Sequence, residues 1–103
     1  MNIDFSIAKD SATVKLVGDV DEYTSRTLRE DIDKLIDDLN GIRFMVFDMK
    51  GVSFIDSTGL GFVLGRYKKL KAKRAELLLA NVPPQVDKVF RTSGVYTFVP
   101  KVD

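Results

Sequence analysis

The sequence predicts one α/β domain with a mixed, mostly parallel sheet of four to five strands and with helices packed on one face. Strand-like apolar segments alternate with segments in which apolar residues recur every three or four positions, as on one face of a helix. Only the first two strands follow each other directly, so the later strands require parallel crossovers of one hand. The predicted order is β-β-α-β-α-β-α-β. The 103 residues suffice for one hydrophobic core, and we expect a single domain over residues 1–103.

The first two predicted strands form an antiparallel hairpin. Apolar and polar residues alternate near the N-terminus, over 3–7, and apolar residues return over 14–20. A short polar break at Asp10 and Ser11 separates the two segments, which indicates a tight turn.

The first predicted helix follows this hairpin. Apolar residues recur at helical spacing from Leu28 to Leu39, and charged residues occupy the opposite face. The residues that can cap its ends are Thr24, Ser25 or Thr27 at the start and Asn40 with Gly41 at the end.

The middle of the chain predicts a buried strand, a second helix and another strand. The run from Phe44 to Met49 is apolar nearly throughout, as in a strand that is covered on both faces or nearly so. Apolar residues then recur at helical spacing over 60–70, and residues 77–80 form a short buried strand.

Proline and glycine mark the last predicted elements. Pro83 and Pro84 open a third helix, in the position where proline does least harm, and Gly94 ends it. The apolar residues over 96–99 predict a last edge strand before Pro100.

The composition argues against catalysis. The sequence contains neither cysteine nor histidine, which removes disulfides, thiolate chemistry, the commonest general base and the commonest metal ligand. Any enzyme built on this chain would have to work with carboxylates, lysines and hydroxyls, and we expect neither a cofactor nor a metal.

The first residues and the charge distribution bear on location and partners. Residues 1–9 lack the features of a signal peptide, and no apolar run approaches the roughly 20 residues that span a bilayer. A cytoplasmic protein without membrane contact is expected. Residues 1–56 carry 12 acidic and 7 basic side chains, whereas residues 57–103 carry 3 and 9. This uneven balance favours recognition of another protein over binding of nucleic acid.

The stretch FIDSTGLGFVLGRYK, residues 54–68, lies where a predicted strand passes into a helix. Its glycines are spaced G-x-G-x-x-x-G, which matches neither the dinucleotide fingerprint nor the phosphate-binding loop. Without histidine a Ser-His-Asp triad is impossible. We interpret Gly61 and Gly65, four apart on one helix face, as residues that let the helix pack close to the sheet.

Ser57 admits two interpretations at the start of this helix. Ser57 or Asp56 can cap the helix, which stabilises a helix by about 1 kcal/mol. Ser57 can also accept a phosphate, because the N–H groups and the positive dipole end of a helix N-terminus favour an anion. A phosphate would add about −1.5 to −2 charge at one surface spot. Such a serine is a candidate switch.

These segments resemble a known family. FIDSTGLG followed by VLGRYK is similar to the signature of bacterial anti-sigma factor antagonists, the sporulation-type members of the STAS domain family. The upstream LVGDVDEYT resembles the family's L-x-G-x-[LV]-D segment, and the downstream VPPQVDKVFRTSGV resembles its third helix. The resemblance covers essentially the whole chain, with the order and spacing of the elements preserved.

The resemblance implies a regulatory, non-catalytic protein. Members of this type bind an anti-sigma factor that is itself a serine kinase, and they thereby free the sigma factor without touching it. The kinase phosphorylates the serine after the motif aspartate, which is Ser57 here, and this abolishes tight binding. A metal-dependent serine phosphatase restores it. Thr58 stands where many relatives have a second serine, which leaves the acceptor position intact.

The residues expected to form the partner-binding surface are Asp19, Asp21, Tyr23, Thr24, Asp56, Thr58, Gly59, Leu60 and Gly61. The first four end the second strand, which should run parallel beside the strand that precedes Ser57, so both groups should lie at one edge of the sheet. Asp19 and Asp21 either offer acidic contacts or belong to a solvated loop with a turn-capping aspartate. Asp56 either positions the Ser57 hydroxyl or caps the helix.

Other interpretations stay open at this point. The chain can be a STAS subunit of a larger signalling or lipid-transport assembly, with Ser57 as an unmodified cap. It can also be an enzyme or nucleotide-binding protein that uses the glycine stretch, although histidine and a phosphate-binding lysine are missing there. The basic run over 66–74 is interpreted as an exposed face that complements the helix dipole.

Overall fold

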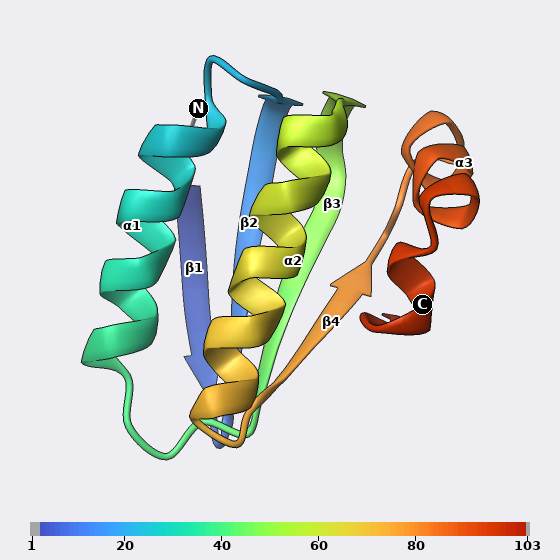
Figure 1. The fold of residues 1–103 in the computed structure, drawn as a ribbon. Helices are drawn as coiled ribbons and strands as arrows, with labels where there is room; N and C mark the ends of the chain where they lie inside the picture. The colour runs from blue at the N-terminus through green and yellow to red at the C-terminus, as the bar shows by residue number, and fades with distance from the viewer. Residues whose placement is uncertain (1–2, 103) are drawn as a thin grey trace.

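A computed structural model describes residues 3–102 as a five-stranded sheet with its strands in chain order, β1-β2-β3-β4-β5 (Figure 1). The elements are β1 (Ile3–Ala8), β2 (Ser11–Val20), α1 (Ser25–Asp38), β3 (Phe44–Ile55), α2 (Ser57–Ala72), β4 (Glu76–Ala80), α3 (Pro84–Ser93), the short 3-10 helix η1 (Val95–Thr97) and β5 (Lys101–Val102). Strand β1 is antiparallel to β2, and the other pairings are parallel. The predicted fold class and element order are confirmed.

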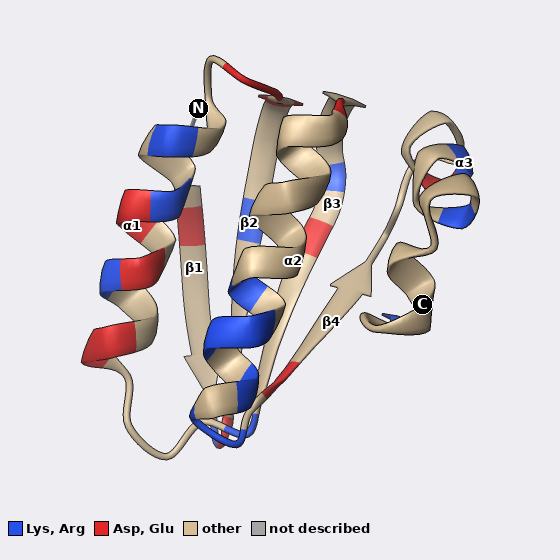
Figure 2. Ribbon diagram, viewed as in Figure 1, with Lys and Arg blue, Asp and Glu red and all other residues tan. Residues whose placement is uncertain are grey.

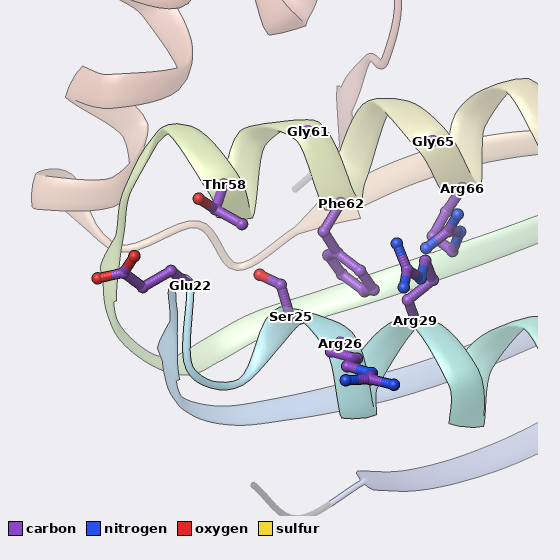
Figure 3. Close-up of a pocket in the computed structure, with 9 residues that line it drawn as sticks. All are labelled: Glu22, Ser25, Arg26, Arg29, Thr58, Gly61, Phe62, Gly65 and Arg66. Carbon is purple, nitrogen blue, oxygen red and sulfur yellow. The ribbon is translucent and has the colours of Figure 1, made fainter.

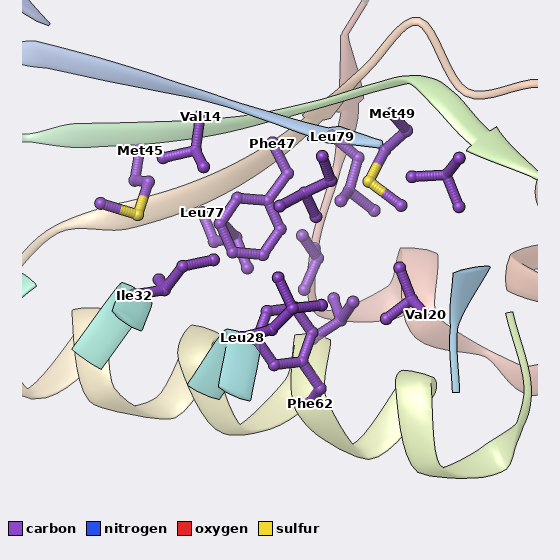
Figure 4. Close-up of a cluster of buried hydrophobic side chains, with 14 of the residues drawn as sticks. Val14, Val20, Leu28, Ile32, Met45, Phe47, Met49, Phe62, Leu77 and Leu79 are labelled. Atoms are coloured by element: carbon purple, nitrogen blue, oxygen red, sulfur yellow. The ribbon is translucent and has the colours of Figure 1, made fainter. Parts of the chain in front are cut away.

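The hydrophobic core lies between one face of the sheet and the helices (Figure 4). Successive parallel strands advance in one direction across the sheet, so right-handed crossovers bring their helices to the same face. Phe47 of β3 stacks on Phe62 of α2 with ring centroids 5.8 Å apart, and Leu28 and Ile32 of α1 are buried in the same cluster. The predicted one-sided packing of helices is therefore confirmed.

The apolar run at the start of β3 is fully buried on one face of the sheet and only partly buried on the other. Met45, Phe47 and Met49 point into the core and are buried, whereas Phe44 and Val46 on the other face stay partly exposed. The other face carries no helix in the described part of the chain, because the crossovers all pass on one side. The prediction that this strand is covered on both faces, or nearly so, therefore holds for the core face and is too strong for the other face.

Two bulges interrupt the pairing of β3 with β2, between the partners of Lys15 and Val17 and between those of Gly18 and Asp19. Their effect is visible in the burial pattern of β3, where the inward residues change from every second to every third position at Met49, Val52 and Ile55. Bulges of this kind bend a strand and redirect its side chains. They bring Ile55, at the end of β3, beside Val20, at the end of β2.

The C-terminal segment differs from the prediction. Residues 95–97 form η1 instead of a strand, and β5 follows Pro100 instead of preceding it. Gly94 ends α3 with a left-handed φ of 81°. The Tyr96 hydroxyl then donates a hydrogen bond to the Asp87 carboxylate, and the Tyr96 ring packs edge-on against Phe90 at 5.6 Å. These contacts with α3 outweigh the strand propensity of the aromatic residues.

The basic run on α2 is partly an interhelical contact, because two of its side chains pair with acidic side chains of α1. Figure 2 shows basic residues along α2 and both acidic and basic residues along α1. Arg66 Nε lies 2.9 Å from Asp33 Oδ1, and Lys69 Nζ lies 3.0 Å from Asp37 Oδ1. Lys73 Nζ donates to two carbonyls at the end of α1, at 2.6 and 3.2 Å. The expectation of a wholly exposed face is corrected for these three residues, which hold α2 against α1.

Candidate functional site: the surface around Ser57

The parallel pairing of β2 and β3 brings two loops to the same edge of the sheet. Val20 and Ile55 are register partners at the ends of these strands, and the Asp56 amide donates to the Val20 carbonyl at 3.3 Å. The chain continues from Val20 into the loop before α1 and from Ile55 into the start of α2. The predicted meeting of the two segments near Ser57 is therefore observed.

Asp56 joins these segments and caps α2. Its Oδ1 accepts a hydrogen bond from the Gly59 amide at 2.9 Å, and its Oδ2 accepts one from the Glu22 amide at 3.3 Å. The first bond is the side-chain cap of α2, so the two alternatives for Asp56 resolve in favour of capping. Ser57 is the first residue of α2 and is exposed. Its hydroxyl is thus not needed as the cap.

The loop between β2 and α1 is shaped by its own side chains. Asp21 Oδ1 accepts hydrogen bonds from the amides of Tyr23 and Thr24 at 3.0 and 3.1 Å. The Thr24 hydroxyl donates to the Asp19 carbonyl at 2.8 Å. Asp21 is therefore the turn-capping aspartate, whereas Tyr23 is presented outward with 84% of its surface exposed.

Gly59 is the glycine that permits close packing. A Cβ on Gly59 would lie 2.2 Å from the Val20 carbonyl oxygen and 2.7 Å from Ile55 Cγ1, so no side chain fits there. Leu60 beside it packs partly buried against the core. Gly59 thus fixes the position of the start of α2, and the predicted role of both residues in partner binding stays a prediction.

Gly61 and Gly65 do not have the packing role predicted for them. A Cβ on either residue would meet nothing within 4 Å, because both face an open groove between α1 and α2 (Figure 3). We call this the α1/α2 groove. Its volume is about 420 Å³, and Thr58 and Glu22 lie at its Ser57 end. The sequence shows a glycine at each position, and only the geometry separates Gly59 from the other two.

The exposed members of the site include two acidic and two aromatic side chains. The exposed residues are Asp19, Glu22, Tyr23, Phe54, Ser57, Thr58 and Gly61. Glu22 was not predicted, because its contribution depends on its backbone bond to Asp56 and on its place at the groove. Phe54 was also not predicted; it is 51% exposed and is the register partner of Asp19. An apolar residue in a strand sequence normally indicates the core, so no local signal identifies it.

The site presents a hydroxyl without the partners that would activate it. The sequence has no histidine, and residues 3–102 contain no group of three or more side chains that could hold a metal ion. None of the helices in this part of the chain is long and apolar enough to cross a membrane. The site is thus centred on an exposed serine at the start of a helix that Asp56 caps.

The chain belongs to the STAS domain family, whose model matches residues 2–103. The resemblance drawn from the sequence motifs is therefore confirmed. The anti-sigma F factor antagonist of Paenibacillus polymyxa is 34% identical over 90 residues, which are 87% of this chain and 76% of that protein. This relative is named as an antagonist of a regulatory factor, in line with the expectation of a protein that is not an enzyme.

Solved structures agree with this assignment. The structure of the anti-sigma factor antagonist SpoIIAA in its unphosphorylated form matches with a TM-score of 0.80 and 26% identity, over 99% of this chain and 89% of that one. SpoIIAA in its phosphorylated form matches with a TM-score of 0.72 and 25% identity, over 99% and 92% of the two chains.

Proposed function

We propose that this chain is an anti-sigma factor antagonist whose binding is switched by phosphorylation of Ser57. The unphosphorylated form binds an anti-sigma factor that is a serine kinase, and this binding releases the sigma factor. The observation that carries the proposal is the exposed Ser57 at the first position of α2, next to a cap that Asp56 supplies. A serine that the helix does not need as its cap is free to accept a phosphate.

The start of α2 tolerates a phosphate without unfolding. The first amides of a helix have no partners within the helix, and the positive end of the dipole favours an anion. Gly59 donates its amide to Asp56, so the cap is independent of the Ser57 hydroxyl. Phosphorylation would therefore change the charge of the surface while the fold stays intact.

The added charge is large enough to act as a switch. The phosphate brings about −1.5 to −2 charge to a surface that already exposes Asp19 and Glu22. A partner carboxylate about 6 Å away would be repelled by about 3 kcal/mol per unit charge pair, at an effective dielectric of about 20. That repulsion corresponds to about a hundredfold loss of affinity.

The family relatives support the same function. The Paenibacillus polymyxa relative and SpoIIAA are both named as antagonists of anti-sigma factors, and SpoIIAA has a phosphorylated form. We extend both properties to this chain. A serine phosphatase that removes the phosphate from Ser57 would complete the cycle.

Intact-mass analysis after incubation with ATP and the cognate anti-sigma factor kinase tests the proposal. We expect one phosphate on the wild type, none on Ser57→Ala, and one on the matched control Thr58→Ala. An unmodified wild type in the presence of an active kinase would contradict it. That result would favour the role of a STAS subunit in a larger assembly, with Ser57 unmodified.

A further inference from the structure

The α1/α2 groove is kept open by two glycines that the fold itself does not require. Gly61 and Gly65 lie within the 16-residue helix α2, and neither has a positive φ or a neighbour that a Cβ would meet. Glycine inside a helix is less favourable than alanine by conformational entropy. A methyl group at either position would occupy part of the groove. The two glycines therefore lower the stability of α2 and leave the groove open.

The wall of the groove carries a buried cation with an unused donor. The Arg66 side chain is only 9% exposed, its Nε is paired with Asp33, and its guanidinium lies over the Phe62 ring at 5.5 Å. Arg66 Nε and Nη1 are both buried, and neither makes a hydrogen bond within residues 3–102, although Nε lies 2.9 Å from Asp33 Oδ1 in the ion pair. A buried donor without an acceptor is unfavourable, so an acceptor that enters the groove would gain from this bond.

A second arginine adds to the positive potential at the end of the groove that is farther from Ser57. Arg29 of α1 lies beside Arg66 in the groove, with its guanidinium on the same side (Figure 3). Burial lowers the pKa of Arg66, Asp33 opposes this shift, and the positive charge of Arg29 adds to it. Asp33 is paired with Arg66, and Arg29 makes no ion pair within residues 3–102, which leaves the positive charge of Arg29 unbalanced.

We propose that the α1/α2 groove receives an acidic side chain of the same protein partner that covers Ser57, with its carboxylate bound between Arg29 and Arg66. This inference rests on the proposed function. A guanidinium presents paired N–H donors that match the two oxygens of a carboxylate. The groove is continuous with the Ser57 surface, because Thr58 and Glu22 belong to both. A single bound partner can therefore reach both places.

The charges along the groove also fix the direction of the bound segment. Glu22 lies at the Ser57 end, Arg26 of α1 is paired with Glu30, and the pair Arg29 and Arg66 lies toward the middle of α2. The partner should thus place a basic side chain near Glu22 and its acidic side chain further along the groove. A segment bound in the reverse direction would bring like charges together, which is strongly unfavourable.

Calorimetric titration of the cognate anti-sigma factor kinase with a set of variants tests the groove. We expect Gly61→Ala and Gly65→Ala to bind about tenfold more weakly, because a methyl group blocks a central contact, while both variants melt at a higher temperature than the wild type. Arg29→Gln should also bind more weakly and should lose part of the salt dependence of the affinity. Lys68→Gln, on the same helix but outside the groove, is the charge control and should bind like the wild type.

The outcomes separate this inference from the proposed function. A wild type that binds the kinase, together with glycine and Arg29 variants that bind equally well, overturns the groove proposal alone. A wild type that does not bind an active kinase overturns both. Inorganic phosphate that shifts the Gly61 and Gly65 amide signals in NMR spectra, with kinase binding unchanged in the variants, would make the groove a small-anion site and would also overturn the proposal.

Discussion

Replacing Gly59 by alanine tests whether the start of α2 is fixed by contact with the ends of two strands. The added Cβ would lie 2.2 Å from the Val20 carbonyl oxygen and 2.7 Å from Ile55 Cγ1. The oxygen belongs to the backbone of β2, so relief requires α2 or the strand end to shift. Asp56 holds the Gly59 amide at 2.9 Å, so a shift of the helix would also disturb the cap.

The magnitude follows from two opposing effects. Forcing extra atoms into a well-packed site costs about 1–3 kcal/mol, and contact with backbone places Gly59→Ala at the upper end. Alanine recovers about 1 kcal/mol of helix propensity. We therefore expect the free energy of unfolding to fall by about 2 kcal/mol, which lowers the melting temperature by about 10 °C in a domain of this size.

Gly61→Ala is the matched control, because it makes the same chemical change two residues further along α2. Its Cβ meets nothing within 4 Å, so only the propensity gain remains and stability should rise by roughly 0.5–1 kcal/mol. Urea denaturation of both variants, followed by circular dichroism, measures the difference. A Gly59→Ala variant as stable as the wild type would refute the argument that close contact requires glycine there.

Three further predictions concern Ser57, Asp56 and Asp87. Ser57→Asp should unfold like the wild type yet bind the anti-sigma factor kinase about tenfold to a hundredfold more weakly in a calorimetric titration; a variant that fails to fold would instead make Ser57 structural. Asp56→Ala should lower the free energy of unfolding by about 1–2 kcal/mol, measured by urea denaturation, because it removes the cap of α2 and the bond to Glu22. Hydrogen bonds from the Tyr96 hydroxyl, and from the side chains of Arg91 and Lys101, hold the pKa of Asp87 well below its usual range. This stabilisation is complete above the unfolded pKa of about 3.9 and is lost as the pH falls through the lower folded pKa. The free energy of unfolding should therefore fall less steeply with decreasing pH in Asp87→Asn than in the wild type. Equal slopes for the two proteins would contradict the assignment.

The features of the fold that follow from the periodicity of apolar residues were predictable. Helical spacing from Leu28 to Leu39 and strand-like runs around it indicate the element order, because periodicity reflects which face is buried. The approach of the loop after β2 to the start of α2 was predictable as well, because neighbouring parallel strands end at one edge of a sheet. Such inferences need only the order of the elements.

Features that depend on exact contacts between distant segments were not predictable. Gly59, Gly61 and Gly65 look alike in the sequence, yet only Gly59 lies against another strand end. Arg66 belongs to a run of basic residues that indicates a solvated face, and its burial follows from the approach of Asp33 on a separate helix. The segment over 95–97 has strand propensity, but its contacts with α3 produce a 3-10 helix.

The two carboxylate oxygens of Asp56 hold the loop before α1 and the start of α2 together. One carboxylate holds the Glu22 amide and the Gly59 amide, and the adjacent loop is internally fixed by Asp21. The segments that carry Tyr23 and Ser57 are therefore held in place before any partner arrives. Association then needs to immobilise only a few side chains, which reduces the entropy lost on binding. The partner meets a surface that is already assembled.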